Sequence, residues 1–144
     1  MKKDNNLRPV LELIALSNYA DFSKDGKLSI NGIFDEIYAK KFPTKFLRGY
    51  LVFTISGVEP FQGLTLSTTI KNPQGKSVIE KSIEIKAGVR GKGNFIAELV
   101  GMPLDMAGEY RVSVNYRGSN IGGTTFQVVR INEENQRNPG KPTN

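Results

Sequence analysis

Apolar and polar residues alternate along much of the chain, most regularly at positions 109–117. Every second residue of this segment is apolar, at Tyr110, Val112, Val114 and Tyr116. A period of two is typical of a β-strand with one buried side and one side in water. The glycine-rich positions 118–123 predict a hairpin turn, and positions 124–131 predict the strand that returns from it.

The same pattern predicts further strands upstream, at positions 10–19, 27–38, 48–58, 64–70, 76–86 and 94–100. The first of these also has apolar residues at roughly helical spacing, but a strand is favoured because a turn and another β-like run follow it. Asn31-Gly32 predicts a bend within the second run, and Asn72-Pro73-Gln74-Gly75 predicts a tight turn. Seven to nine short strands without a convincing amphipathic helix predict an all-β fold, an antiparallel immunoglobulin-like β-sandwich.

The residues expected to face the core lie on one side of these strands. They include Leu51, Phe53, Ile55, Ile79, Ile83, Ile85, Phe95, Ala97 and Leu99. The chain has 144 residues, of which 38% are apolar and 24% are charged, as is usual for one globular domain. We expect the sandwich at positions 10–131, between a loose N-terminal lead-in at 1–9 and a disordered polar tail at 132–144.

Three residue types are missing from the chain, which has no cysteine, histidine or tryptophan. Their absence excludes disulfides, thiolate metal sites, the commonest general base and the strongest platform for stacking ligands. We therefore expect no catalysis, no metal and no cofactor. The lack of cysteine fits a reducing compartment, and no segment approaches the length of a membrane span, so a cytoplasmic location is expected.

The net charge is +6, and most of the excess lies in the middle third of the chain. Within the predicted loop at 40–48, four cations alternate with two phenylalanines: Lys40, Lys41, Lys45 and Arg48, with Phe42 and Phe46. These cations are the candidate partner-binding residues, because they create a positive potential that attracts an acidic partner. Two alternatives stay open. Cations interleaved with aromatic rings are also typical of nucleic-acid binding proteins. In the other alternative, the segment is only a crossover loop, whose phenylalanines fill the end of the sandwich.

Positions 21–32 resemble a calcium-binding EF-hand loop, with oxygen-bearing side chains at the first, third and fifth positions and Gly26 at the sixth. The twelfth position needs a bidentate glutamate, and Gly32 stands there instead. The flanking segments are also β-like rather than helical. We therefore expect a hairpin with its turn at Asp25-Gly26, and no metal site.

Positions 88–93 are a second candidate, at which Arg90, Lys92 and backbone amides would hold an anion. Neither a helix nor a Gly-Lys-Ser/Thr ending follows, so a mobile loop is the alternative. Asp35 and Glu36 are adjacent carboxylates, but neighbours on a strand point to opposite faces and do not converge on one atom. No catalytic residue is predicted.

Positions 104–112 resemble the tyrosine corner of immunoglobulin-like domains, in which a tyrosine hydroxyl ties a loop to the edge of the sandwich. Val112 stands where antibody domains have their second cysteine, so an antibody-type domain is not implied. The resemblance gives Tyr110 a structural role.

Four motifs point further: Ala20-Asp21, the stretch DGKLSINGIFD at 25–35, Lys41-Phe42-Pro43 and the Gly-x-Tyr at 108–110. Together they resemble a bacterial family of uncharacterised small β-sandwich proteins. The resemblance covers roughly positions 10–131 and implies a single immunoglobulin-like domain. It carries no activity, substrate or binding residue.

These observations favour a non-catalytic interaction or structural module that binds another protein, with an acidic surface as the expected partner chemistry. The alternative is a polyanion or nucleic-acid binding protein that uses the loop at 40–48. The identity of the partner and the oligomeric state stay open, a homo-oligomer included.

Overall fold

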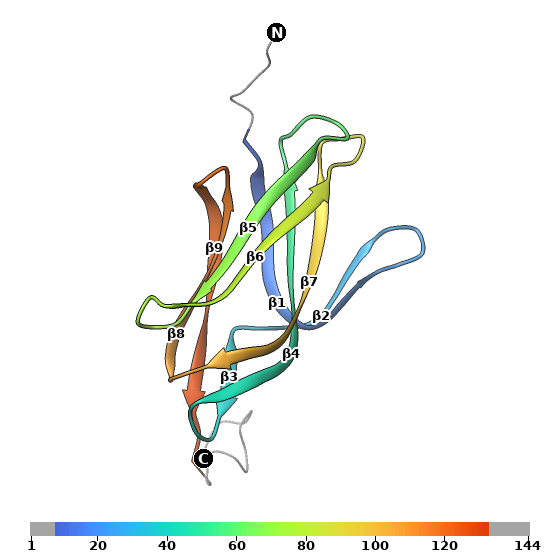
Figure 1. The fold of residues 1–144 in the computed structure, drawn as a ribbon. Helices are drawn as coiled ribbons and strands as arrows, with labels where there is room; N and C mark the ends of the chain where they lie inside the picture. Colours follow the sequence, from blue (N-terminus) through green and yellow to red (C-terminus); the bar gives the residue numbers. More distant parts are fainter. Residues whose placement is uncertain (1–7, 133–144) are drawn as a thin grey trace.

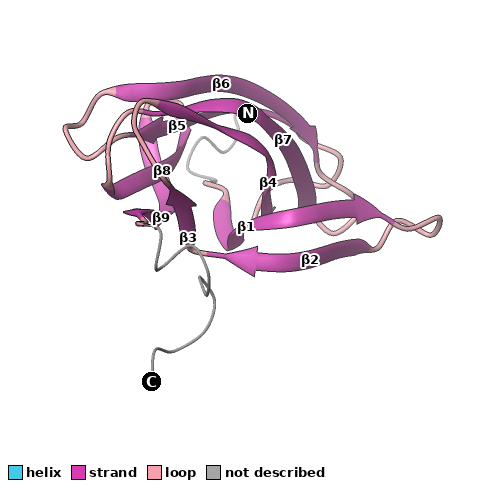
Figure 2. Cartoon of the chain, turned by 90° about the horizontal axis from the view of Figure 1, so that it is seen from below, coloured by secondary structure: helices cyan, strands magenta, loops and turns pink. Residues whose placement is uncertain are grey.

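The alternating segments of the sequence form β-strands in the computed structural model, which describes residues 8–132 (Figure 1). The strands of this part are β1 (Val10–Phe22), β2 (Leu28–Phe34), β3 (Glu36–Ala39), β4 (Thr44–Ser56), β5 (Gly63–Lys71), β6 (Ser77–Lys86), β7 (Gly93–Leu104), β8 (Gly108–Tyr116) and β9 (Ser119–Arg130). A four-stranded sheet, in the order β2-β1-β4-β7, packs on a five-stranded sheet, in the order β3-β9-β8-β5-β6 (Figure 2). The expected immunoglobulin-like β-sandwich is confirmed. All pairs are antiparallel except β3 and β9, which are parallel.

Burial follows the period-two pattern, and the core lies between the two sheets. Most residues expected there are buried: Leu51, Phe53, Ile55, Ile83, Ile85, Ala97 and Leu99. Ile79 and Phe95 are half-buried and pack against the core. The strand that opened the sequence analysis places Tyr110, Val112, Val114 and Tyr116 in the core. The alternation therefore identified the inward side of β8 correctly.

Tyr110 forms the corner that its sequence context predicted. Its hydroxyl donates a hydrogen bond to the carbonyl of Met106 (2.8 Å) and accepts one from each of the backbone N–H groups of Asp105 (3.2 Å) and Met106 (3.3 Å). The ring stacks on Phe126 with the centroids 5.2 Å apart. One side chain thus holds the connection between β7 and β8 against the core.

The run at positions 27–38 is two strands rather than one. The chain leaves the four-stranded sheet after Phe34 and enters the five-stranded sheet at Glu36, so it changes layers at Asp35. The bend expected at Asn31-Gly32 lies within β2 and does not shift its register with β1, although Gly32 has a φ of +73°. The alternating pattern shows which residues are apolar but not which sheet a strand joins.

The predicted loop at 40–48 is shorter than expected. β4 begins at Thr44, so Lys45 and Arg48 lie on a strand, and the turn between β3 and β4 is 40–43, with a cis peptide bond at Phe42-Pro43. Pairing with β7 extends the strand to this point, since Thr44 lies opposite Leu104.

The glycine-rich turn predicted at 118–123 is also shorter, because β9 begins at Ser119. Gly122 and Gly123 lie inside the strand, where neighbouring atoms leave no space for a side chain. A Cβ on Gly122 would lie 2.6 Å from Cδ2 of Leu11, and one on Gly123 would lie 2.1 Å from the carbonyl oxygen of Val112. These glycines allow close approach rather than a turn.

Within residues 8–132, no helix has the length and apolar composition needed to cross a membrane. The expected lead-in at 1–9 and tail at 132–144 fall almost entirely outside the described residues.

Candidate functional site

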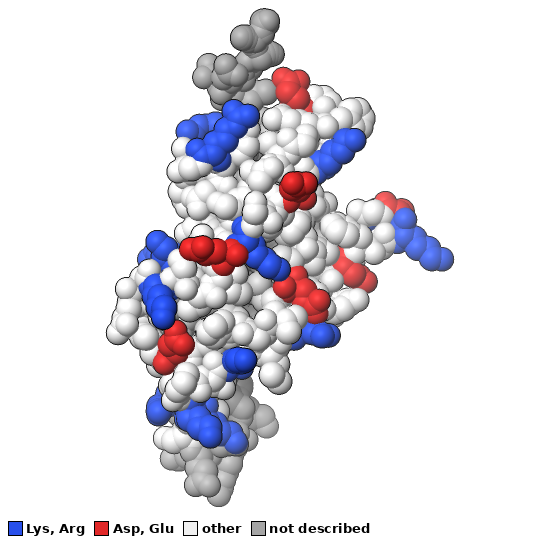
Figure 3. Space-filling model, viewed as in Figure 1, with Lys and Arg blue, Asp and Glu red and all other residues white. Residues whose placement is uncertain are grey.

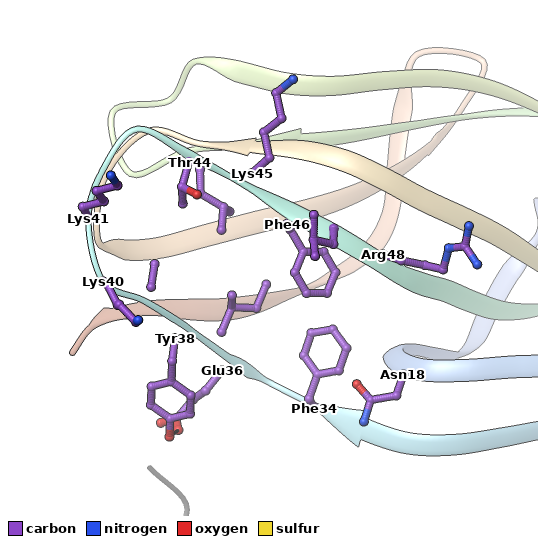
Figure 4. A pocket seen from close by; sticks show the side chains of 14 residues that line it. Asn18, Phe34, Glu36, Tyr38, Lys40, Lys41, Thr44, Lys45, Phe46 and Arg48 are labelled. Atoms are coloured by element: carbon purple, nitrogen blue, oxygen red, sulfur yellow. Dashed lines mark hydrogen bonds between the residues drawn. The ribbon is translucent and has the colours of Figure 1, made fainter. Parts of the chain in front are cut away.

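An open groove of about 750 Å³ lies where β3 and β4 diverge into different sheets (Figure 4). β3, the turn 40–43 and the first part of β4 supply most of its lining. Asn18, Phe34 and Leu104 add one side chain each from β1, β2 and β7. The change of layers at Asp35 creates this space, because it separates β3 from the sheet that β4 joins.

Two phenylalanine rings form an apolar floor in the groove. The rings of Phe34 and Phe46 lie 5.7 Å apart between centroids, tilted by 57°. Gly49 makes room for this pair, since a Cβ there would lie 2.5 Å from Cε2 of Phe46. The buried side chains of Ile37 and Leu104 continue the apolar lining.

The four predicted cations all border this groove and are exposed. Figure 4 shows Lys40 and Lys41 at the turn, with Lys45 pointing away from the floor. Arg48 differs from the three lysines, because its Nε lies 2.9 Å from Oε2 of Glu98 on β7. In the described part of the chain, no carboxylate lies within ion-pair distance of the three lysines. The uncompensated charge is therefore concentrated at the turn, and we call this site the basic groove.

Arg130 is a further cation at this end, and the sequence did not indicate it. It lies beside Ala39 in the parallel pairing of β3 with β9, and its guanidinium carbon is 5.4 Å from the centroid of the Phe42 ring. Figure 3 shows Lys and Arg side chains gathered at the lower end of the molecule, where Figure 1 places this turn. The contact also covers one face of Phe42, while Phe46 packs in the floor, so neither ring is a free stacking platform.

The two acids at the start of β3, Asp35 and Glu36, both act on Tyr38. The Tyr38 hydroxyl donates a hydrogen bond to Glu36, and this bond raises the pKa of Tyr38. The backbone carbonyl of Asp35 accepts a hydrogen bond from Gln127. Glu36 therefore has a partner within β3, away from the floor of the groove.

A model of a family of unknown function, DUF6941, matches residues 12–129. The chain belongs to this family. A family of unknown function with a β-sandwich fold was the expectation from the sequence, and the family match and the two packed sheets confirm it. The signature motifs at 20–43 stay a prediction. No curated protein gives a significant match to the chain.

Several solved structures are similar to this DUF6941 chain. A DNA-bound alkylpurine DNA glycosylase from Pseudomonas fluorescens matches with a TM-score of 0.54 and 14% identity, over 85% of this chain and 31% of the glycosylase. An immunoglobulin-like protein from Pseudomonas aeruginosa matches with a TM-score of 0.48 and 16% identity, over 87% of this chain and 99% of that protein. A β-glucosidase from Listeria innocua matches with a TM-score of 0.47 and 9% identity, over 86% of this chain and 16% of the glucosidase. This chain thus spans about a third of the glycosylase.

The second candidate site of the DUF6941 chain, at 88–93, is a tight turn. The N–H of Gly88 donates to the carbonyl of Lys92 (2.7 Å). The ammonium of Lys92 lies 3.4 Å from Oε1 of Glu12, whose pKa is held below its usual value, first by a hydrogen bond from Ser56 and then by Lys92. The charge of Lys92 is thus already compensated, which leaves Arg90 as the cation for an anion at this turn.

The hairpin of β1 and β2 projects from the sandwich, and the sequence that resembles a calcium-binding EF-hand loop lies at its tip (Figure 1). The N–H of Ser23 donates to the carbonyl of Lys27 (2.8 Å), and Gly26 has a φ of +83°. The carboxylate of Asp25 accepts a hydrogen bond from the Ser23 hydroxyl and lies 3.6 Å from Lys27. Among the described residues, no cluster of acidic side chains is arranged to hold a metal ion.

Millimolar calcium is therefore expected to leave the melting temperature of the protein unchanged, because only a ligand that binds the native state raises it. Thermal unfolding with calcium and with a chelator measures this. A rise of several degrees that the chelator reverses would show that the hairpin binds the ion.

Proposed function

We propose that this DUF6941 protein is a non-catalytic module that binds another protein through the basic groove. The observation that carries the proposal is the combination of an apolar floor, Phe34 with Phe46, and uncompensated cations at one end of the same groove. Burial of the floor supplies binding energy, and the lysines favour a partner with an acidic surface. A cytoplasmic setting and the absence of catalysis belong to the same proposal.

Binding of a polyanion, such as a nucleic acid, is the alternative. The exposed lysines and Arg130 favour it, since cations of this kind contact phosphates. The positions of Phe42 and Phe46 favour a protein instead, because bases need open aromatic faces. The two candidates differ in chemistry and are separated by treatment with nuclease.

A charge reversal tests the proposal. The triple variant Lys40→Glu, Lys41→Glu and Lys45→Glu is expected to lower the yield of partner recovered from the native cell by about tenfold or more. Its control reverses Lys71, Lys76 and Lys81, which are exposed on β5, β6 and their turn, and therefore changes the net charge equally. The melting temperatures of both variants confirm that the fold is kept.

Equal recovery of the same partners by both variants would show that the binding surface lies elsewhere. Loss of recovery after nuclease treatment of the wild-type sample would favour the polyanion alternative. A partner that resists nuclease and is lost with the first variant, but not with the second, supports the proposal.

A further inference from the structure

Among residues 8–132, β3 is the outermost strand of its sheet and pairs with β9 alone, so its other backbone edge is free within this part of the chain. The carbonyls of Asp35 and Ala39 accept hydrogen bonds from the N–H groups of Gln127 (2.8 Å) and Ile131 (2.9 Å). Backbone groups alternate in direction along a strand, so those of Glu36 and Tyr38 face away from β9. In the described part of the chain these groups have no backbone partner, and they are donors and acceptors of the kind that an added strand would use.

This edge borders the basic groove, which Figure 4 shows between the ribbons of β3 and β4. The side chains of Ile37 and Ala39 point inward and are buried. In a sheet, residues opposite each other on neighbouring strands point to the same side. An added strand would therefore place every second side chain over the floor of Phe34 and Phe46.

Charge along the edge changes sign from one end of β3 to the other. Asp35 and Glu36 lie at its start, while Lys40 and Lys41 follow its end and Arg130 lies beside Ala39. A strand with acidic residues at the Lys40 end would meet cations, and the same residues at the other end would meet acids. The preferred occupant therefore carries its acidic residues at one end.

We propose that the free edge of β3 accepts an extended segment of the protein partner as an added strand, with apolar side chains in the basic groove and acidic residues beside Lys40 and Lys41. This inference rests on the proposed function and names the way in which the partner is recognised. A second copy of this chain is a poorer occupant. Its own Ile37 and Ala39 are buried in its own core, so it would leave the groove unfilled.

Two peptides of eight residues test this mode of binding. In both peptides valine occupies every second position, and threonine or aspartate occupies the positions between. The two aspartates lie at the C-terminal end of the first peptide and at the N-terminal end of the second. Because β3 runs toward Lys40, the first suits parallel and the second antiparallel addition. At least one is expected to bind the full chain with a dissociation constant below about 1 mM, measured by fluorescence anisotropy.

Backbone changes separate strand addition from simple filling of the groove. Tyr38→Pro removes an N–H that does not pair with β9, so we expect the fold to be kept and peptide binding to weaken about tenfold. Tyr38→Ala removes the ring but keeps the N–H, and is expected to change binding much less. Two further versions of the peptide carry N-methyl groups, one on the amides of the valines and the other on the amides of the residues between them. Only one of the two versions is expected to bind more weakly, since alternate N–H groups face β3.

The outcomes divide clearly. Equal effects of the two methylated sets, or of Tyr38→Pro and Tyr38→Ala, would overturn strand addition, as would the absence of binding by both peptides. If the lysine reversals still abolish recovery of the partner in that case, the proposed function stands without this mode. A wild-type dimer that Tyr38→Pro dissociates, observed by sedimentation, would instead make the occupant a second copy and overturn the proposal.

Discussion

Replacement of Tyr110 by alanine is expected to lower the free energy of unfolding by about 3 to 5 kcal/mol. The side chain is fully buried, and its ring stacks on Phe126. Removing the ring leaves a cavity between the sheets, and the backbone groups of Asp105 and Met106 lose their shared partner. Denaturation by urea, followed by circular dichroism, measures the change.

Tyr110→Phe keeps the ring and removes the hydroxyl, so about 1 to 2 kcal/mol of the loss is expected to remain. Tyr19→Phe is the matched control, because the Tyr19 side chain is half exposed and its hydroxyl lies at the surface, 3.5 Å from Asp21. This change is expected to cost almost nothing. If all three variants unfold like the wild type, Tyr110 does not hold the connection between β7 and β8.

Gly91→Ala is expected to cost about 3 kcal/mol, for two reasons that add. Gly91 has a φ of +71°, which is unfavourable for alanine, and a Cβ there would lie 2.1 Å from the carbonyl oxygen of Val58. Val58 lies in the connection from β4 to β5, and Gly91 lies in the connection from β6 to β7. The N–H of Val58 donates a hydrogen bond to the carbonyl of Gly91 (3.4 Å), and the added methyl group would push these two connections apart.

Gly75→Ala is the control for the backbone conformation alone. Gly75 has a φ of +85°, but no atom lies within 4 Å of the position of an added Cβ. A cost of about 1 to 2 kcal/mol is expected there. Equal costs at Gly75 and Gly91, measured by the same denaturation, would mean that the two connections do not need the close contact.

The sequence indicated the faces of the strands well, because the alternation of residues such as Tyr110 and Val112 depends on local geometry alone. It did not indicate which strands are neighbours. The layer change at Asp35 and the parallel pairing of β3 with β9 both depend on contacts between residues far apart in the chain. The prediction of a turn at Gly122 and Gly123 was wrong, because these glycines lie inside β9 and allow close packing there.

The candidate site was predicted in part for the same reason. Lys40, Lys41 and Lys45 stand out in the sequence as a local excess of charge, and the structure leaves them without a carboxylate among the described residues. Arg48 looked equivalent, but Glu98 on β7 compensates it. Arg130 could not be placed beside Phe42 without the register of β9. The groove itself has no sequence signal, because it arises from the divergence of two strands.

The parallel pairing of β3 with β9 also determines when the basic groove can form during synthesis. Residues 36–39 leave the ribosome early, whereas their pairing partners at 127–130 are among the last of the described strands to emerge. Pairing between such distant segments comes late in folding, because the intervening chain must first be ordered. A nascent chain therefore has β3 and the lysines that follow it before it has β9, the strand on which β3 pairs. A partner that needs the complete basic groove would therefore bind only chains that have been translated through β9.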